Sequence, residues 1–239
     1  MTNTANRPLS WYEERIACLE AFMTGERVEL FRRTVAQRTL RMTLLAENTY
    51  HPQNAAALIR HCEAFGLQRM HTVETLCAFR PAAAVVRGTD RWVDVCRHAS
   101  TADALRALKA EGYRIVATTP HREDSTPETF DVRRGPFALV FGTEHAGISD
   151  EVRDAADEFL RIPMCGMVES LNVSASAAIL IYLLSQRMRQ ACTDWAMTPR
   201  EQTETLYRWM YRSVADAPQI LERKFGDTQN DDSTQYPAF

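Results

Sequence analysis

The sequence lacks the features that mark membrane, secreted and metal-binding proteins. No apolar run reaches about 18 residues, so no membrane-spanning helix is predicted. The N-terminus has no apolar core behind a basic start, so a secretory signal is not predicted and a cytoplasmic location is expected. The six cysteines are scattered without a C-x-x-C pair, and the histidines show no H-x-x-H spacing. Neither a disulfide framework nor a metal site is therefore expected.

Two nucleotide-binding signatures are also missing, and lysine is nearly absent. The chain contains no G-x-G-x-x-G fingerprint and no G-x-x-x-x-G-K-[ST] phosphate loop. Lysine occurs only as Lys109 and Lys224 among 28 basic residues, and the others are arginines. Codon bias explains this, or else a need for the planar guanidinium, which suits phosphate and carboxylate. The net charge of -3 argues against a general basic coat for nucleic acid but leaves room for a local arginine patch.

The remaining composition is that of an ordinary globular protein, with 45% hydrophobic and 25% charged residues. Apolar strands are predicted at 41–46, 69–73, 92–96, 113–118, 137–141 and 158–162. Helices are predicted between or after them at 54–65, 101–111 and 172–189. Strands that alternate with helical stretches of about a dozen residues indicate parallel βαβ units. The predicted fold class is therefore α/β.

Helical segments flank this α/β core on both sides. Ser10 and Glu13 form a capping-box pattern that predicts a helix over 11–23, and a second helix follows to about 37. Two more helices are predicted over 200–214 and 217–224. The expected division is an N-terminal helical extension at 1–38, a central domain at 39–192, a C-terminal helical extension at 193–226 and a flexible tail at 227–239.

Three unusual segments follow predicted strands, where ligands bind in open parallel sheets. The first contains Asn54, which is suited to a helix N-cap, and Arg60 within an otherwise apolar helix. The second, residues 141–149, contains two glycines that permit close backbone approach, although a turn capped by Ser149 also explains it. The third, residues 162–172, is too long and too apolar for an ordinary connection. It is predicted either to bind an apolar group such as an adenine ring or to be covered by a partner.

Together these segments resemble the three ordered motifs of the SPOUT methyltransferases, in the TrmH (SpoU) branch. The matching residues are Asn54-x5-Arg60, Phe141-Gly-x-Glu144-x-x-Gly147, and Ile162-Pro-Met with Ser170-Leu-Asn172. The terminal helices look like those of the tRNA guanosine-18 2′-O-methyltransferases. The roughly 38 residues before the first strand leave no room for the N-terminal RNA-binding domain of the related ribosomal enzymes.

The resemblance implies methyl transfer from S-adenosylmethionine to the ribose 2′-OH of guanosine 18 in the tRNA D-loop. It also implies a Rossmann-like parallel sheet with a deep C-terminal trefoil knot, and a homodimer. The implied partners are tRNA and a second copy of the chain, and not DNA or a membrane. Methylation of another tRNA or rRNA site, or a non-catalytic RNA-binding protein on the same fold, remain as alternatives.

By the same resemblance, the catalytic residues are Arg60, Asn54, Glu144, Ser170 and Asn172, with Arg60 as the proposed activator of the 2′-OH. The cofactor residues are Thr118, Gly142, Ile162, Met167 and Leu171, mostly through backbone atoms. The tRNA-binding residues are Arg32, Arg33, Arg187 and Arg189, for which ordinary solvated surface charge is the alternative.

Overall fold

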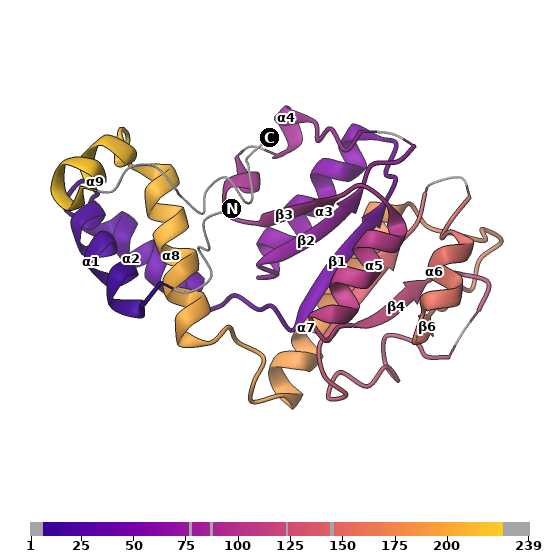
Figure 1. The fold of residues 1–239 in the computed structure, drawn as a ribbon. Coiled ribbons are helices and arrows are strands. Elements are labelled where there is room, and N and C mark those ends of the chain that lie inside the picture. Colours follow the sequence, from indigo (N-terminus) through magenta and orange to yellow (C-terminus); the bar gives the residue numbers. More distant parts are fainter. Residues whose placement is uncertain (1–6, 77, 87, 123, 144–145, 227–239) are drawn as a thin grey trace. The chain divides into compact units, whose positions relative to one another are not determined.

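The computed structural model describes residues 7–76, 78–86, 88–122, 124–143 and 146–226 (Figure 1). The predicted tail at 227–239 lies outside the described residues. The described residues divide into two compact units, one formed by residues 7–38 with 196–226 and the other by Thr39–Trp195. Within the described residues, no helix is both long and apolar enough to cross a membrane.

The central unit is built on a six-stranded sheet. Its strands are β1 (Met42–Glu47), β2 (Arg69–Val73), β3 (Asp94–His98), β4 (Arg114–Thr118), β5 (Phe137–Phe141) and β6 (Glu158–Leu160). They lie in the order β3-β2-β1-β5-β4-β6, and neighbouring strands in this order pair in parallel. The α/β class with a parallel sheet is therefore confirmed. Strands β2 and β3 lie to one side of β1, and β5, β4 and β6 lie to the other, which makes the carboxyl edge between β1 and β5 a topological switch point.

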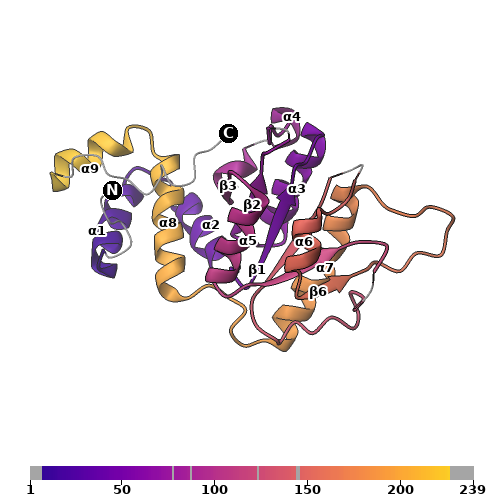
Figure 2. The ribbon, with the colours of Figure 1, turned by 45° about the vertical axis from the view of Figure 1, so that its right-hand side comes forward.

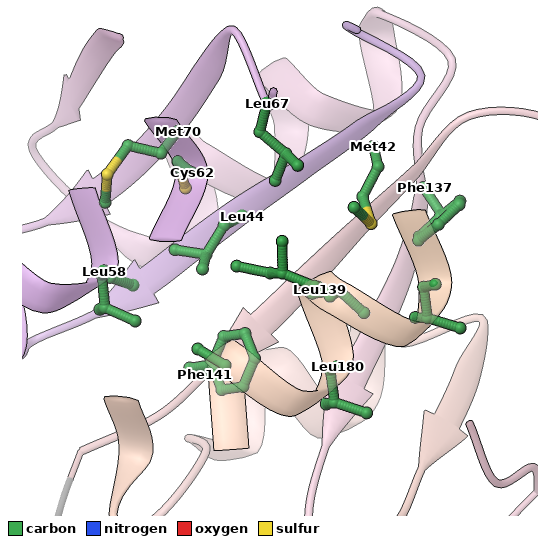
Figure 3. Packing of buried hydrophobic residues seen from close by; sticks show 14 of the residues in the cluster. Met42, Leu44, Leu58, Cys62, Leu67, Met70, Phe137, Leu139, Phe141 and Leu180 are labelled. Atoms are coloured by element: carbon green, nitrogen blue, oxygen red, sulfur yellow. The ribbon is translucent and has the colours of Figure 1, made fainter. Parts of the chain in front are cut away.

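Successive side chains of the central strands point to opposite faces, and each face is covered by helices. Leu44 on β1 and Leu139 on β5 belong to the core cluster shared with α3 (Pro52–Ala64) and α7 (Val173–Ala191). Figure 3 shows these leucines gathered with Leu58 of α3 and Leu180 of α7. Leu45, the next residue on β1, packs in the cluster of α5 (Thr101–Ala110) and α6 (Asp150–Ala155). The central unit is thus a helix–sheet–helix sandwich.

The terminal unit contains four described helices from the two ends of the chain. They are α1 (Leu9–Glu20), α2 (Gly25–Val35), α8 (Pro199–Ser213) and α9 (Ala217–Phe225). Aromatic rings join them in edge-to-face contacts. The ring centroids of the half-buried Trp11 and the buried Tyr207 lie 5.4 Å apart, and those of the buried Phe31 and Trp209 lie 5.8 Å apart. The helices predicted at both ends are confirmed, and the structure adds that they share one core.

The capping box predicted at Ser10 is wrong. Helix α1 begins at Leu9 with Pro8 in the N-cap position, and no side-chain cap hydrogen bond is present there. Pro8 has an extended backbone, and Ser10 lies within the first helical turn. The structure also contains short elements that no periodicity indicated, namely α4 (Ala83–Val86), the 3₁₀ turn η2 (Thr89–Arg91) and α6.

Candidate active site

A cavity of about 450 Å³ opens at the carboxyl edge of the sheet. The ends of β4, β5 and β6 and the first turns of α3 and α7 line it. Seven of the residues singled out from the sequence meet there: Asn54, Thr118, Gly142, Ile162, Ser170, Leu171 and Asn172. All three sequence motifs therefore contribute to one cavity. Glu144, from the second motif, lies outside the described residues.

Asn54 and Asn172 join the first motif to the third. Asn172 is the N-cap of α7, where its Oδ1 accepts hydrogen bonds from the backbone N–H groups of Ser174, at 2.8 Å, and Ala175, at 3.3 Å. Its Nδ2 donates to Oδ1 of the buried Asn54 at 3.2 Å. Helix α3 begins at Pro52 with His51 as its N-cap, so the interpretation of Asn54 as an N-cap is wrong. The buried side chain of Asn54 instead accepts the hydrogen bond from Asn172.

Gly142 sits where the second motif folds back on itself. A Cβ atom at this position would lie 2.1 Å from the carbonyl carbon of Gly147, so no larger residue fits without moving backbone. Thr143 and Gly147 close the turn through two backbone hydrogen bonds of 2.9 and 3.1 Å. Ser149 then caps α6 by accepting from the Val152 N–H, as the turn-and-cap interpretation of this segment predicts. The tight turn brings backbone groups to the cavity wall.

The rest of the cavity wall combines apolar side chains with polar groups. Ile162, Met164 and Leu171 supply apolar surface. The Thr118 hydroxyl donates to the Val140 carbonyl at 2.8 Å, so it is already engaged within the sheet. This mixture suits a flat aromatic ring attached to polar groups.

Three further residues of the wall that carry ionisable side chains, His51, His121 and Arg153, were not predicted. Arg153 donates to the Ile148 carbonyl at 2.9 Å and pairs with Asp150. The positions of His51 and His121, a few residues beyond the ends of β1 and β4, are the signal that could have identified them.

Arg60 and Met167 do not line this cavity. Six positions on a helix are about 1.7 turns, so Arg60 projects from a different side of α3 than Asn54, and it is exposed. The neighbouring His61 makes a hydrogen bond to the backbone of Ser174, which places this part of α3 beside the first turn of α7. Burial, followed by the Arg60 charge, lowers the pKa of His61 below its usual value. Met167 is fully exposed on the connection between β6 and α7, which extends away from these elements (Figure 2).

The four arginines expected to bind tRNA are of two kinds. On α2, Arg33 is exposed, and the half-exposed Arg32 donates from Nε to Glu20 at 3.1 Å. On α7, Arg187 donates to the Pro127 carbonyl, and the Arg189 guanidinium lies 4.0 Å from the ring centroid of Trp195. Burial lowers the pKa of Arg189. The arginines of α7 are therefore partly engaged in packing within the central unit.

No group of three or more metal-ligating side chains is found in the described parts of the chain. Of the six cysteines, the five that the structure describes are free thiols, and Cys165 is exposed on the connection to α7.

Comparison with known proteins gives consistent matches. Residues 41–182 match the model of the SpoU rRNA Methylase family. The chain is 32% identical over 209 residues to the tRNA (guanosine(18)-2'-O)-methyltransferase of Borreliella burgdorferi, with 87% of this chain and 95% of that protein covered. The crystal structure of the A. aeolicus TrmH/SpoU tRNA modifying enzyme superposes with a TM-score of 0.70 at 28% identity, covering 83% of this chain and 99% of that one. The SpoU methyltransferase AviRb from Streptomyces viridochromogenes, in complex with the cofactor AdoMet, gives a TM-score of 0.54 at 25% identity over 66% of this chain and 62% of that one.

Proposed function

The chain belongs to the SpoU rRNA Methylase family, and from this premise we propose that it methylates the ribose 2′-OH of guanosine 18 in the tRNA D-loop. The methyl donor is S-adenosylmethionine. One observation favours tRNA over ribosomal RNA. The tRNA (guanosine(18)-2'-O)-methyltransferase of B. burgdorferi matches this chain over 95% of its own length, so the similarity extends beyond the methylase region at residues 41–182.

The residues of the cavity fit this cofactor. Gly142 has no side chain because the backbone of Gly147 and Ile148 packs against it, and this close packing places the backbone of the turn at the cavity wall. Ile162 and Leu171 supply apolar surface for the adenine, beside polar groups such as Thr118. Met164 lines the cavity, whereas Met167 does not, so we assign the apolar contact to Met164. When bound, S-adenosylmethionine supplies a methyl group activated by the positively charged sulfur.

The chain's own residues would position the ribose and stabilise charge on its oxygen. Asn54 and Asn172, held together by their hydrogen bond, fix one wall of the cavity, and Ser170 lies on the same wall. The Arg60 guanidinium stays protonated, so it is not a literal base. We assign it to the adjacent RNA phosphate and to the negative charge that develops on the 2′-oxygen, with a phosphate oxygen accepting the proton. Glu144 remains a proposed contributor to turnover by resemblance.

Several structural features of the family are part of the proposal. We propose that the long connection between β6 and α7 is threaded as part of a trefoil knot, which explains its length and apolar character. We also propose a homodimer, because Ile179 and Tyr182 on α7 are 37% and 49% exposed although both are large and apolar. Because the substrate is tRNA, the protein would act in the cytoplasm.

For tRNA binding we propose Arg32 and Arg33 on α2 together with Arg187 and Arg189 on α7. Guanidinium groups bind phosphate with favourable geometry, and phosphate contacts supply most of the affinity for RNA. The exposure of Arg33 supports this role most directly.

The test is nucleotide-resolved mapping of 2′-O-methylation on total tRNA and rRNA incubated with the protein and S-adenosylmethionine. The proposal predicts one new mark, at guanosine 18 of tRNA. A mark confined to rRNA or to another tRNA position would contradict the substrate assignment, and no mark on any RNA would contradict the enzymatic activity.

A further inference from the structure

Glu47 is a buried carboxylate at the end of an apolar strand. It is the last residue of β1 and is 2% exposed. Its Oε1 accepts a hydrogen bond of 2.6 Å from the Thr101 hydroxyl, and its Oε2 accepts one of 3.0 Å from the backbone N–H of Ser149. Both of these donors are neutral. Removing a carboxylate from water is costly unless its oxygens find partners, so a carboxylate at this position indicates that both hydrogen bonds matter.

These two hydrogen bonds connect the end of β1 to two different segments. Thr101 is the first residue of α5, behind the sheet. Ser149 is the residue at which the turn of the second motif ends and α6 begins. Strand β1 pairs with β5, with Ala46 opposite Phe141, so Glu47 lies beside the point where the chain leaves β5 and enters that turn.

The described residues of the second-motif turn, 142–143 and 146–148, are attached to the sheet at both ends of the turn. At its start it continues directly from β5, and within itself it is closed by the hydrogen bonds between Thr143 and Gly147. At its exit, the Ser149 N–H binds the Glu47 carboxylate. Gly142, Thr143, Gly147 and Ile148 all line the cavity, whereas Glu47 does not. The carboxylate therefore acts on the cavity only through the turn.

We propose that Glu47 is a positioning residue for the methyl-transfer site, holding the described parts of the second-motif turn, residues 142–143 and 146–148, where they form one wall of the cofactor cavity. The identity of the ligand rests on the proposed function above, and the anchoring of the turn does not. The hydrogen bond from the Ser149 N–H to Oε2 of Glu47 holds the turn and so affects cofactor binding. The hydrogen bond from the Thr101 hydroxyl to Oε1 holds the start of α5.

A pair of substitutions at Ser149 isolates the hydrogen bond. The φ angle of Ser149 is -69°, which is close to the value that proline fixes, so Ser149→Pro removes the N–H with little change at this residue. Ser149→Ala keeps the N–H, and both variants lose the hydroxyl that caps α6. Loss of a hydrogen bond to a buried charge predicts a Kd for S-adenosylhomocysteine that is about tenfold higher in Ser149→Pro than in Ser149→Ala. The Kd for tRNA is expected to be the same in both, and equal cofactor affinities would overturn the proposal.

Substitutions at the carboxylate itself provide the complementary test. Glu47→Ala is expected to weaken S-adenosylhomocysteine binding about as much as Ser149→Pro does, and to raise the KM for S-adenosylmethionine with little change in that for tRNA. Glu47→Gln keeps an acceptor for the Ser149 N–H and should restore the affinity to within about threefold of the parent protein. Thr101→Val is the matched control, because it removes only the other hydrogen bond. If it weakens cofactor binding as much as Glu47→Ala, Glu47 acts through packing and the proposal fails.

Amide hydrogen exchange separates this proposal from the proposed function. Exchange over residues 146–149 is expected to be about tenfold faster in Glu47→Ala than in Thr101→Val, with or without cofactor. A parent protein that does not bind S-adenosylhomocysteine would contradict the methyltransferase assignment, while the exchange result would still decide the anchoring. Unchanged exchange in Glu47→Ala would overturn the anchoring. If Glu47→Ala does not fold, the Ser149 pair gives the same decision.

Discussion

Asn172 and Asn54, 118 positions apart in the chain, are joined by a hydrogen bond of 3.2 Å from Nδ2 of the first to Oδ1 of the second. At the same time, Oδ1 of Asn172 accepts from two backbone N–H groups at the start of α7. A single amide thus caps the helix with its oxygen and reaches the first motif with its nitrogen. Aspartate lacks the donor for the second contact, and serine is too short for it.

Substitutions of Asn172 can separate these two roles. Asn172→Ser keeps a capping oxygen, so its free energy of unfolding should stay within about 0.5 kcal/mol of the parent, whereas Asn172→Ala should lose about 1 kcal/mol. Both variants lose the contact with Asn54, so both should lose most methylation activity. Denaturant unfolding and initial methylation rates measure the two effects. Full activity in Asn172→Ser would show that the contact with Asn54 is not needed.

Replacement of Arg60 should affect the reaction and not the cofactor. Because a protonated guanidinium is assigned to the charge that develops on the 2′-oxygen, Arg60→Ala should lower the single-turnover methylation rate by about 100-fold or more. The Kd for S-adenosylhomocysteine should not change, since Arg60 lies outside the cavity wall. Arg106→Ala, which removes an exposed arginine of α5, is the control for general charge loss. An Arg60→Ala enzyme that turns over normally is incompatible with the assigned mechanism.

The arginines expected to bind RNA should differ in their effect on stability. Arg33→Ala should weaken tRNA binding and reduce the slope of log affinity against log salt by about 1, with no change in thermal stability. Arg189→Ala should also lower the melting temperature, because it removes the packing on Trp195 and the hydrogen bond of 3.4 Å to the Phe65 carbonyl. Filter binding over a salt series and thermal unfolding give both quantities. An unchanged salt slope in Arg33→Ala would remove Arg33 from the tRNA-binding surface.

The buried His71, which lies against the half-buried His98, should make the stability of the central unit depend on pH. Nδ1 of His71 lies 2.9 Å from Nε2 of His98, and burial, then His98, then Arg69 lower the pKa of His71 to about 3. Below about pH 6.5 the unfolded chain takes up a proton on His71 that the folded chain does not. The free energy of unfolding therefore decreases as the pH is lowered, until it levels off near pH 3. This group should contribute about 2 kcal/mol of loss between pH 6.5 and 4.5.

The measurement compares the parent with His71→Gln by denaturant unfolding across that pH range. The glutamine variant, which cannot titrate, should be less stable near neutral pH and should lose less stability on acidification. Parallel curves for the two proteins would show that His71 is not the group responsible.

Local patterns predicted the elements well where apolar residues run without interruption. The strand Phe137–Phe141 has the predicted bounds, since it is fully apolar and is buried on both faces. The predicted starts of two helices were wrong because a proline at or next to the N-terminus sets where each helix begins. Pro8 and Pro52 each stand at or next to the start of a helix, so Ser10 and Asn54 lie inside the helices that they were expected to cap.

The contacts that assemble the site could not be predicted from local patterns. The hydrogen bond between Asn54 and Asn172 depends on how α3 and α7 pack against the same face of the sheet. Glu47 looks like an ordinary polar residue at the end of a strand until its burial and its two donors are known. The resemblance to a family supplied the site residues that lie in motifs. It did not supply the residue that holds one of those motifs in place.

The most direct test of the central claim uses two tRNA transcripts that differ in one oxygen atom. One carries guanosine and the other 2′-deoxyguanosine at position 18, and both are incubated with the protein and methyl-labelled S-adenosylmethionine. Methyl transfer to the ribose 2′-OH predicts about one methyl group for each guanosine-containing tRNA and none for the deoxy transcript. Equal labelling of the two transcripts would show that the methyl group goes elsewhere and would contradict the account.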